Sequence, residues 1–488
     1  MASFKEENSY SNILKRLSAF GGVQIFNIFV SLLRGKFVAM FLGPVGMGIS
    51  SLYATSLAPL QQICGLGLNL AMVKEISANK DDESALRKVL SIATKLILFT
   101  SLLGVVACGL AAPLWSSVTF GNHDHTIPYL WLSIFTGLSI GGAGLLAILQ
   151  GLGEVKRLSK ATLVGGLAGL FFGVPLYYFF GDGGIVPAMI ILSLSSFLFY
   201  FISYRLSTRQ LRKENGPSAD IDSSKLVKSL LSMGFILLVG ALSGQVISYL
   251  INLYIREVGS IADVGLFQGA NSITNQYTGL IMSSLALDYF PRLSACCKDD
   301  VKMKEVVNRQ TEIVMLVATP LIILLLLTAP LIIRILLTES FLVITHLMRW
   351  MGMGMLIQAL AFPLGYIYVA RDDRKAYIWM ECVWANICWL ACSIGFYHLF
   401  GLIGLGVSLV VRGAVDLILN FIVCRRRSGF SYSRGCITPV LLSLLFSILA
   451  FGCSIPEGAI SYIGMAVILI ISALYSFQKL RGKLRKQE

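Results

Sequence analysis

The sequence predicts an all-α, polytopic membrane protein with about fourteen transmembrane helices. Apolar residues make up 56% of its 488 residues and charged residues only 14%, whereas about a quarter of a soluble globular chain is charged. The mean hydropathy is +0.76. The apolar runs recur at roughly 20 to 30 residues, which is enough to cross a hydrocarbon layer of about 30 Å. They lack the period-2 alternation of barrel strands, so helices are expected.

The predicted helices fall into two pseudo-symmetric six-helix lobes followed by two further helices. The turn-rich segment Glu214–Asp220 lies in the longest polar stretch and is interpreted as the linker between the lobes. We expect an N-terminal lobe over residues 1–215, a C-terminal lobe over 216–428, and two additional helices with a basic tail over 429–488. The predicted spans are 17–42, 47–73, 89–112, 127–151, 161–181, 184–204, 229–255, 264–290, 312–337, 342–369, 376–399, 401–424, 437–454 and 459–478.

A short internal repeat agrees with two lobes. Gly43-Pro-Val-Gly-Met-Gly48 follows the first predicted helix, and Gly259-Ser-Ile-Ala-Asp-Val-Gly265 follows the seventh, 216 residues later. Glycine suits such turns because it reaches backbone angles that are closed to other residues. Both segments therefore mark a short outer turn between an odd and an even helix.

The distribution of Lys and Arg predicts an inner-membrane protein with both termini in the cytoplasm. The formal net charge is +14, and with the N-terminus inside, the inner segments hold 33 of the 40 basic residues. This asymmetry is the positive-inside rule. The basic tail Lys479–Lys486 then faces anionic membrane lipids, so no nucleic-acid partner is expected. The first apolar segment lacks a cleavage site and is expected to be a retained helix.

The sequence carries no nucleotide-binding loop, no zinc-ligand spacing and no catalytic-triad signature. No cofactor and no metal are expected, because His123-Asp124-His125 in an outer loop has no third ligand beside it. The ten cysteines lie in spans or cytoplasmic segments, where thiols stay reduced. The longest outer loop, Trp115–Pro128, has only about fourteen residues. A membrane enzyme should carry a larger one, so the chain is not expected to be an enzyme.

Polar residues in the first span form a stripe along one helical face. Gln24, Asn27, Ser31 and Arg34 follow one another at spacings of 3, 4 and 3. Polar groups are costly in lipid and usually face a bundle interior or water. Arg34 has no acidic residue in its own helix, which makes it the first candidate for substrate binding. Lys36 points about 200° away and is expected to snorkel outward.

Two later spans carry similar stripes, which suit the wall of a water-filled cavity. The candidates for substrate binding in them are Asn252, Arg256, Asn271 and Asn275. An alternative stays open, in which amide side chains join helices through hydrogen bonds worth roughly 1 kcal/mol each. The stripes are Gln245, Tyr249, Asn252 and Arg256 in the seventh span, and Gln268, Asn271, Asn275 and Thr278 in the eighth.

Basic residues outnumber acidic residues within the spans, which favours an anionic substrate. Arginine's planar fork matches phosphate oxygens. Arg349 has no helix neighbour of opposite sign and is a secondary candidate for binding. Arg412 and Asp416 are four residues apart and can pair, so we interpret them as structural, with ion coupling as the alternative. The basic residues in spans are Arg34, Lys36, Lys95, Arg334, Arg349 and Arg412; the acids are Glu381 and Asp416, with Asp288 and Glu312 near inner ends.

Several short motifs resemble those of the polysaccharide flippases, the Wzx-type O-antigen translocases. Arg34 followed by Phe41-Leu-Gly-Pro-Val-Gly-Met-Gly48 looks like the family's opening signature. The resemblance spans nearly the whole chain and places it in the superfamily that also holds multidrug exporters and the peptidoglycan-precursor flippase. The other similar segments are Gly65-Leu-Gly-Leu-Asn-Leu-Ala71, Phe290-Pro-Arg-Leu-Ser294, Ala329-Pro-Leu-Ile-Ile333 and Gly401-Leu-Ile-Gly-Leu-Gly406.

The resemblance implies a V-shaped pair of six-helix lobes that moves an undecaprenyl-pyrophosphate-linked oligosaccharide to the periplasmic leaflet by alternating access. It places the family's basic cavity residues first at Arg34, and secondarily at Arg256 and Arg349. Its implied partners are the lipid-linked glycan, membrane lipids and the glycan polymerase machinery. An ion-coupled multidrug exporter and a peptidoglycan-precursor flippase are the alternatives within the superfamily.

Overall fold

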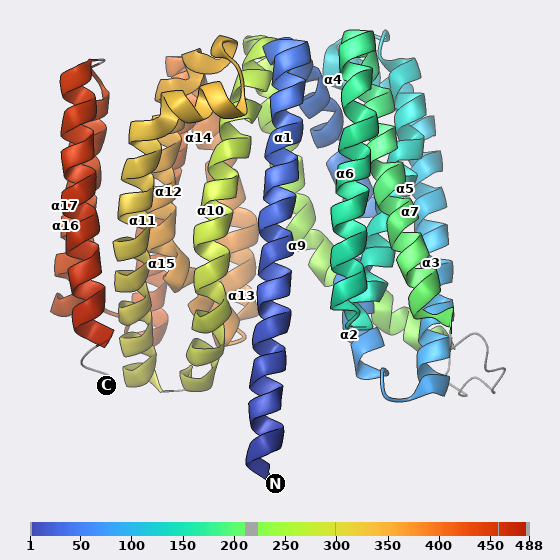
Figure 1. Cartoon of the computed structure of the whole chain (residues 1–488), viewed down its shortest axis with the longest axis horizontal. Helices are drawn as coiled ribbons and strands as arrows, with labels where there is room; N and C mark the ends of the chain where they lie inside the picture. The colour runs from blue at the N-terminus through green and yellow to red at the C-terminus, as the bar shows by residue number, and fades with distance from the viewer. Residues whose placement is uncertain (1, 210–222, 298, 457, 485–488) are drawn as a thin grey trace. The chain divides into compact units, whose positions relative to one another are not determined.

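The structure is a computed structural model that describes residues 2–209, 223–297, 299–456 and 458–484, and most side chains from Phe26 onward. Nearly all of these described residues are helical, which confirms the predicted all-α fold (Figure 1). The chain forms two compact units, Met1–Tyr249 and Leu250–Glu488. Their boundary falls inside helix α9 (Ser223–Val258). The predicted boundaries at residues 215 and 428 stay a prediction.

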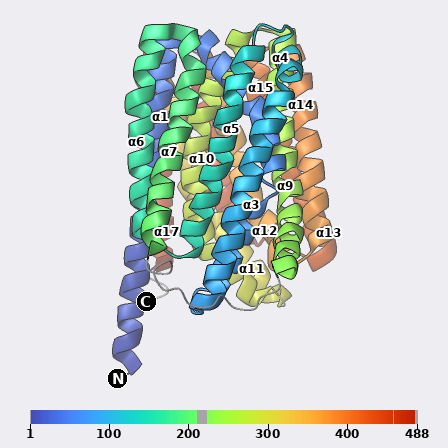
Figure 2. The same ribbon diagram turned by 90° about the vertical axis from the view of Figure 1, so that its right-hand side faces the viewer.

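The helices of the first unit pack as neighbours. Helices α3, α5, α6 and α7 lie side by side, with α5 between α3 and α7 (Figure 2). The unit ends with the first three quarters of α9. Its other helices are α1 (Ala2–Cys64), α2 (Leu68–Ala78), α3 (Glu83–Leu110), α4 (Ala112–Phe120), α5 (Thr126–Gly151), α6 (Val155–Phe180) and α7 (Ile185–Ser207).

The second unit begins with the end of α9 and contains the remaining spans. Helix α12 packs along α15, and α16 and α17 both pack on α11. A π-helical segment, Ile378–Trp384, lies between α13 and α14. The helices are α10 (Ile261–Cys296), α11 (Asp300–Leu336), α12 (Thr345–Ala370), α13 (Arg374–Tyr377), α14 (Ala385–Phe400), α15 (Leu402–Ser428), α16 (Arg434–Ser454) and α17 (Ala459–Leu484).

Every predicted span overlaps one or more of the described helices. Among the described residues, eleven helical stretches are long and apolar enough to cross a membrane. Val155–Ser207 contains two predicted spans, and Phe26–Cys64 covers parts of two others. Helix α10 covers the predicted eighth span. The first two spans are joined by a kink at Gly43, whose φ of 63° and ψ of −164° are non-helical. Pro44 follows it, and its missing N–H favours a kink at this position.

The predicted second span, 47–73, is broken rather than continuous. Helix α1 ends at Cys64 and α2 begins at Leu68, and between them Leu66 and Gly67 have φ values of 52° and 62°. Glycine tolerates this left-handed conformation, whereas leucine is strained in it. The break packs against α9, because a Cβ on Gly67 would lie 2.1 Å from the Gly234 carbonyl oxygen.

The segment predicted as the longest outer loop is partly helical. Helix α4 covers Ala112–Phe120, with Pro113 in its first turn and Gly121 at its C-terminus with φ 76°. Proline is favoured at the start of a helix and a left-handed glycine at its end. These two residues delimit a short helix inside a stretch that composition assigns to a loop.

Large apolar side chains lie on the outer faces of the helices, where a soluble protein would carry polar ones. Leu98 is 71% exposed, Phe171 is 72% exposed and Ile463 is 64% exposed. The buried core of the first unit instead joins α2, α3, α5 and α7 to Leu226 and Leu230 of α9. This arrangement of apolar faces indicates lipid as the solvent of the spans.

Candidate functional site

The predicted stripe of the first span lies on α1. Asn27 and Ser31 are half-buried, and Arg34 is exposed. The Arg34 guanidinium interacts electrostatically with the Tyr177 hydroxyl of α6, the helix that packs most closely along α1. The side chain of Gln24 lies outside the described residues. Arg34 therefore presents a cation that no described ion pair neutralises.

The predicted residues of the seventh and eighth spans differ in exposure. Asn252 is buried, and Arg256 pairs with its neighbour Glu257. On α10 the Asn275 side chain donates a hydrogen bond to the Asn271 carboxamide oxygen at 3.1 Å. Asn271 is half-buried and Asn275 is exposed. The two amides thus form one polar patch, as their spacing of four residues allows.

Arg349 is 3% exposed and binds two backbone carbonyls. Its Nε donates to the Leu326 carbonyl at 3.4 Å, and its Nη1 donates to the Ser454 carbonyl at 2.7 Å. Both acceptors lack a normal helical donor: Pro330, four residues after Leu326, has no N–H, and Ser454 ends α16. These contacts connect α12 to α11 and α16.

We expect Arg349→Ala to destabilise the protein by about 3 kcal/mol, because hydrogen bonds to charged groups are worth roughly 1.5–3 kcal/mol each. The measurement is the Tm of the detergent-purified chain. Arg426→Ala, which removes an exposed arginine at the end of α15, should leave Tm within about 1 °C. An Arg349→Ala variant with an unchanged Tm would contradict the assigned contacts.

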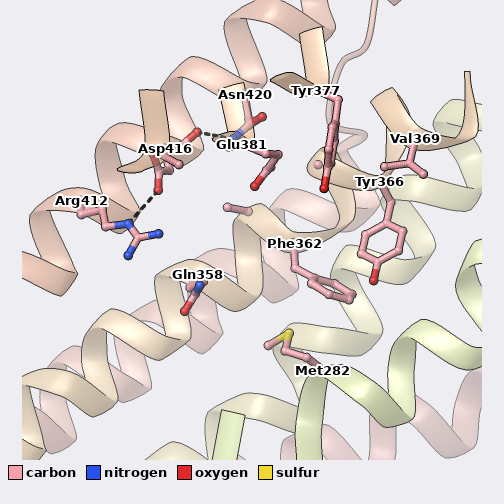
Figure 3. Close-up of a pocket in the computed structure, with 14 residues that line it drawn as sticks. Met282, Gln358, Phe362, Tyr366, Val369, Tyr377, Glu381, Arg412, Asp416 and Asn420 are labelled. Atoms are coloured by element: carbon pink, nitrogen blue, oxygen red, sulfur yellow. Dashed lines mark hydrogen bonds and ion pairs between the residues drawn. The ribbon is translucent and has the colours of Figure 1, made fainter. Parts of the chain in front are cut away.

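A charged cavity of about 380 Å³ lies within the second unit, between α12, α15 and the segment that includes the π-helix (Figure 3). Arg412 and Asp416 of α15 form an ion pair at 3.4 Å, which confirms the pairing predicted from their spacing. The Arg412 guanidinium also lies 5.0 Å from the centre of the Trp389 ring. The other polar lining residues are Gln358, Tyr366, Tyr377, Glu381 and Asn420.

The π-helix positions Glu381 in this cavity. Its carboxylate lies over Gly365 of α12. A Cβ added to that glycine would come within 2.9 Å of Glu381 Oε1. Asn420 donates to the Asp416 carbonyl at 2.9 Å, and its buried Oδ1 has no hydrogen-bond partner among the described residues. Two carboxylates and one guanidinium leave the cluster with one negative charge when all are ionised. Such a cluster can hold a proton, a cation or a hydroxyl-rich group.

A second cavity, of about 180 Å³, lies in the first unit beside the break between α1 and α2. None of the described residues that line it is charged. Gln245, part of the stripe predicted in the seventh span, lines it together with Gln61, Gln62 and Asn69. Irregular backbone at membrane depth is tolerated where it lines a cavity. Spacing along one helix could not predict this group, since its members come from three helices.

These features define a multi-pass helical membrane protein with polar cavities inside its spans. The chain belongs to the family described as polysaccharide biosynthesis protein, which matches residues 13–296. Membership confirms the resemblance predicted from the short motifs. The match covers the first unit from residue 13 onward and the start of the second.

Two curated relatives are flippases or transporters by name. The chain is 24% identical over 369 residues to the lipid III flippase of Escherichia coli (strain K12), covering 73% of this chain and 85% of that protein. It is 23% identical over 394 residues to a Shigella flexneri protein named "Putative O-antigen transporter", covering 78% and 90%. Among solved structures, the lipid II flippase MurJ in an inward closed conformation matches with a TM-score of 0.70 at 16% identity, covering 96% of this chain and 99% of that one.

Proposed function

We propose that this chain is a flippase that moves a lipid-linked oligosaccharide across the inner membrane. The observation that carries the proposal is the combination of a transporter fold, polar cavities inside its spans, and relatives named lipid III flippase and O-antigen transporter. A lipid tail can stay in the bilayer, but its polar head needs a lined path. The chain's own basic residues support an anionic head.

The proposal also specifies the substrate and the direction in which it crosses the membrane. The substrate is an undecaprenyl-pyrophosphate-linked repeat unit of O-antigen or a similar surface glycan, moved from the cytoplasmic to the periplasmic leaflet by alternating access. Both termini lie in the cytoplasm, in agreement with the positive-inside rule. The glycan polymerase machinery would then receive the product. The chain itself makes or breaks no covalent bond.

Arg34 is proposed to hold the pyrophosphate, aided by Gln24, Asn27 and Ser31 on the same face of α1. Its exposure and the lack of a described acidic partner support this role. Asn252, Asn271 and Asn275 are proposed to bond sugar hydroxyls, with Arg256 near the outer end of α9. The two carbonyl contacts of Arg349 favour a role in holding helices together.

Removal of the gene tests the proposed function. We expect the deletion strain to grow normally but to lose its surface polysaccharide, because the repeat unit would stay in the cytoplasmic leaflet. A plasmid copy of the gene should restore the polysaccharide. The measurement is surface glycan on gels and by labelled lectin. Lysis on depletion would instead identify a peptidoglycan-precursor flippase, and intact surface polysaccharide in a viable deletion strain would overturn the proposal.

The acidic cavity of the second unit favours one further candidate, an ion-coupled multidrug exporter. Such a transporter needs intramembrane carboxylates, and Glu381 and Asp416 lie together here. Under the flippase proposal, Glu381→Gln and Asp416→Asn leave drug sensitivity unchanged. Minimal inhibitory concentrations of cationic dyes and antibiotics measure this. A fall of fourfold or more in both variants and in the deletion strain would favour the exporter.

A further inference from the structure

A third cavity, of about 620 Å³, lies in the second unit at the polar ends of α11, α16 and α17. It is separate from the charged cavity described above, because the two share no lining residue. One wall is the first three turns of α11, and the opposite wall is the α15–α16 connection and the start of α16. Lys479 near the end of α17 completes it.

The walls of this cavity are held in place by Asn308, which is 7% exposed. Its Nδ2 donates to the Ser431 carbonyl at 3.1 Å, and its Oδ1 accepts from the Ser433 amide at 2.8 Å. Ser433 in turn caps α16, with its hydroxyl accepting from the Cys436 amide at 3.2 Å. The α15–α16 connection is therefore fixed to α11, and the N-terminus of α16 opens into the cavity.

The charges around the cavity are of both signs. Lys304, Arg309 and Lys479 are cationic, and the N-terminus of the 21-residue helix α16 adds a partial positive charge. Glu305 and Glu312 contribute carboxylates. A bare anion would meet two like charges here. A group that carries a phosphate and an ammonium a few ångströms apart matches both the cationic groups and the carboxylates.

The depth of the cavity in the membrane indicates that such a group belongs to a lipid headgroup. Lys479 directly follows the predicted last span, and Lys304 and Arg309 precede the apolar part of α11, so the cavity lies at the level of lipid headgroups. Basic pockets between membrane helices on the cytoplasmic side bind phosphorylated lipid headgroups. Lysine and arginine bind phosphate through charge-assisted hydrogen bonds, which are stronger than neutral ones.

We propose that this cavity binds the phosphate-bearing headgroup of a bilayer lipid, with phosphoethanolamine as the form that its mixed charge fits. Arg309, Lys479 and the α16 N-terminus bind the phosphate, and Glu305 accepts from the ammonium. The lipid fills the junction between α11 and the last two helices. This site is independent of the proposed transport path, so it stands whether or not the chain is a flippase.

Native mass spectrometry of the purified full chain tests this site. Phosphatidylethanolamine, phosphatidylglycerol and undecaprenyl phosphate are added in equal amounts, and the retained adducts are counted. We expect phosphatidylethanolamine to dominate on the wild type and to fall about tenfold on R309A/K479A. Glu305→Gln should shift the preference toward phosphatidylglycerol. The control R425A/R426A removes two exposed arginines at the same end of the unit, outside the lining.

The control pair should retain wild-type adducts, since it changes the net charge equally but leaves the cavity intact. Equal retention by R309A/K479A and wild type would overturn the proposal, as would an equal loss in both double variants. A loss confined to undecaprenyl phosphate would assign the cavity to the lipid-linked substrate and also overturn it. All substituted residues are exposed, so the variants should fold, which a matching Tm confirms.

Discussion

Cells whose only copy carries Arg34→Ala should display at least tenfold less surface polysaccharide than cells with the wild-type chain. The proposed contact is a charge-assisted pair between the guanidinium and the pyrophosphate, and one hydrogen bond to a charged group is worth about a factor of ten or more. The measurement is surface glycan per cell, normalised to the amount of the protein in the membrane. Arg34→Lys should retain an intermediate level, because lysine keeps the charge without the planar fork.

Lys36→Ala is the matched control for this prediction. It removes a basic residue from the same helix two positions away, on a face about 200° from Arg34. We expect it to leave surface polysaccharide unchanged. Full polysaccharide in Arg34→Ala at normal protein level would remove Arg34 from the binding role, and an equal loss in both variants would mean that only the charge of α1 matters.

Gly67→Val should prevent accumulation of folded protein. The residue has a φ of 62°, and its Cβ would lie 2.1 Å from the Gly234 carbonyl oxygen, a backbone atom that cannot rotate away. Left-handed strain and overpacking together cost about 3 kcal/mol or more. We expect the monodisperse peak in size-exclusion chromatography of detergent extracts to fall at least fivefold relative to wild type, the fold-change that such a loss readily produces in a marginally stable protein.

Gly244→Val on α9 is the control for Gly67→Val. A Cβ at Gly244 meets no atom within 4 Å, so this variant should accumulate normally. Wild-type yield and Tm for Gly67→Val would contradict the close contact between α9 and the break. A variant that folds but is inactive would show that the break contributes to transport rather than to stability.

The spans could be predicted from sequence because apolar run length and charge asymmetry are local properties. The break within the second span could not. Gly65-Leu-Gly67 lies in an apolar run and barely changes its hydropathy, and the left-handed residues are accommodated by contact with Gly234, far along the chain. Helix α4 was missed for a related reason, since Pro113 and Gly121 define a helix too short for a hydropathy signal.

In the candidate site, too, features set by spacing along one helix could be predicted, and those set by contacts between distant segments could not. The Arg412–Asp416 pair was predictable from a spacing of four on one helix. Glu381 was visible as an acid within a span, but its place beside that pair depends on the π-helix and on the packing of α15 against α12. An excess of basic residues over the whole set of spans did not predict a locally acidic cavity. Arg349 looked unpaired because its acceptors are backbone carbonyls of two other helices.

A fluorescence assay of transbilayer movement tests the central claim most directly. The purified chain is reconstituted into proteoliposomes with an undecaprenyl-pyrophosphate-linked oligosaccharide that carries a fluorescent sugar, and an impermeant quencher reports the fraction in the outer leaflet. The account predicts that the wild-type chain exposes the inner-leaflet pool to the quencher and that Arg34→Ala slows this at least tenfold. If the lipid-linked oligosaccharide moves no faster with the folded wild-type chain than in protein-free liposomes, the account is contradicted.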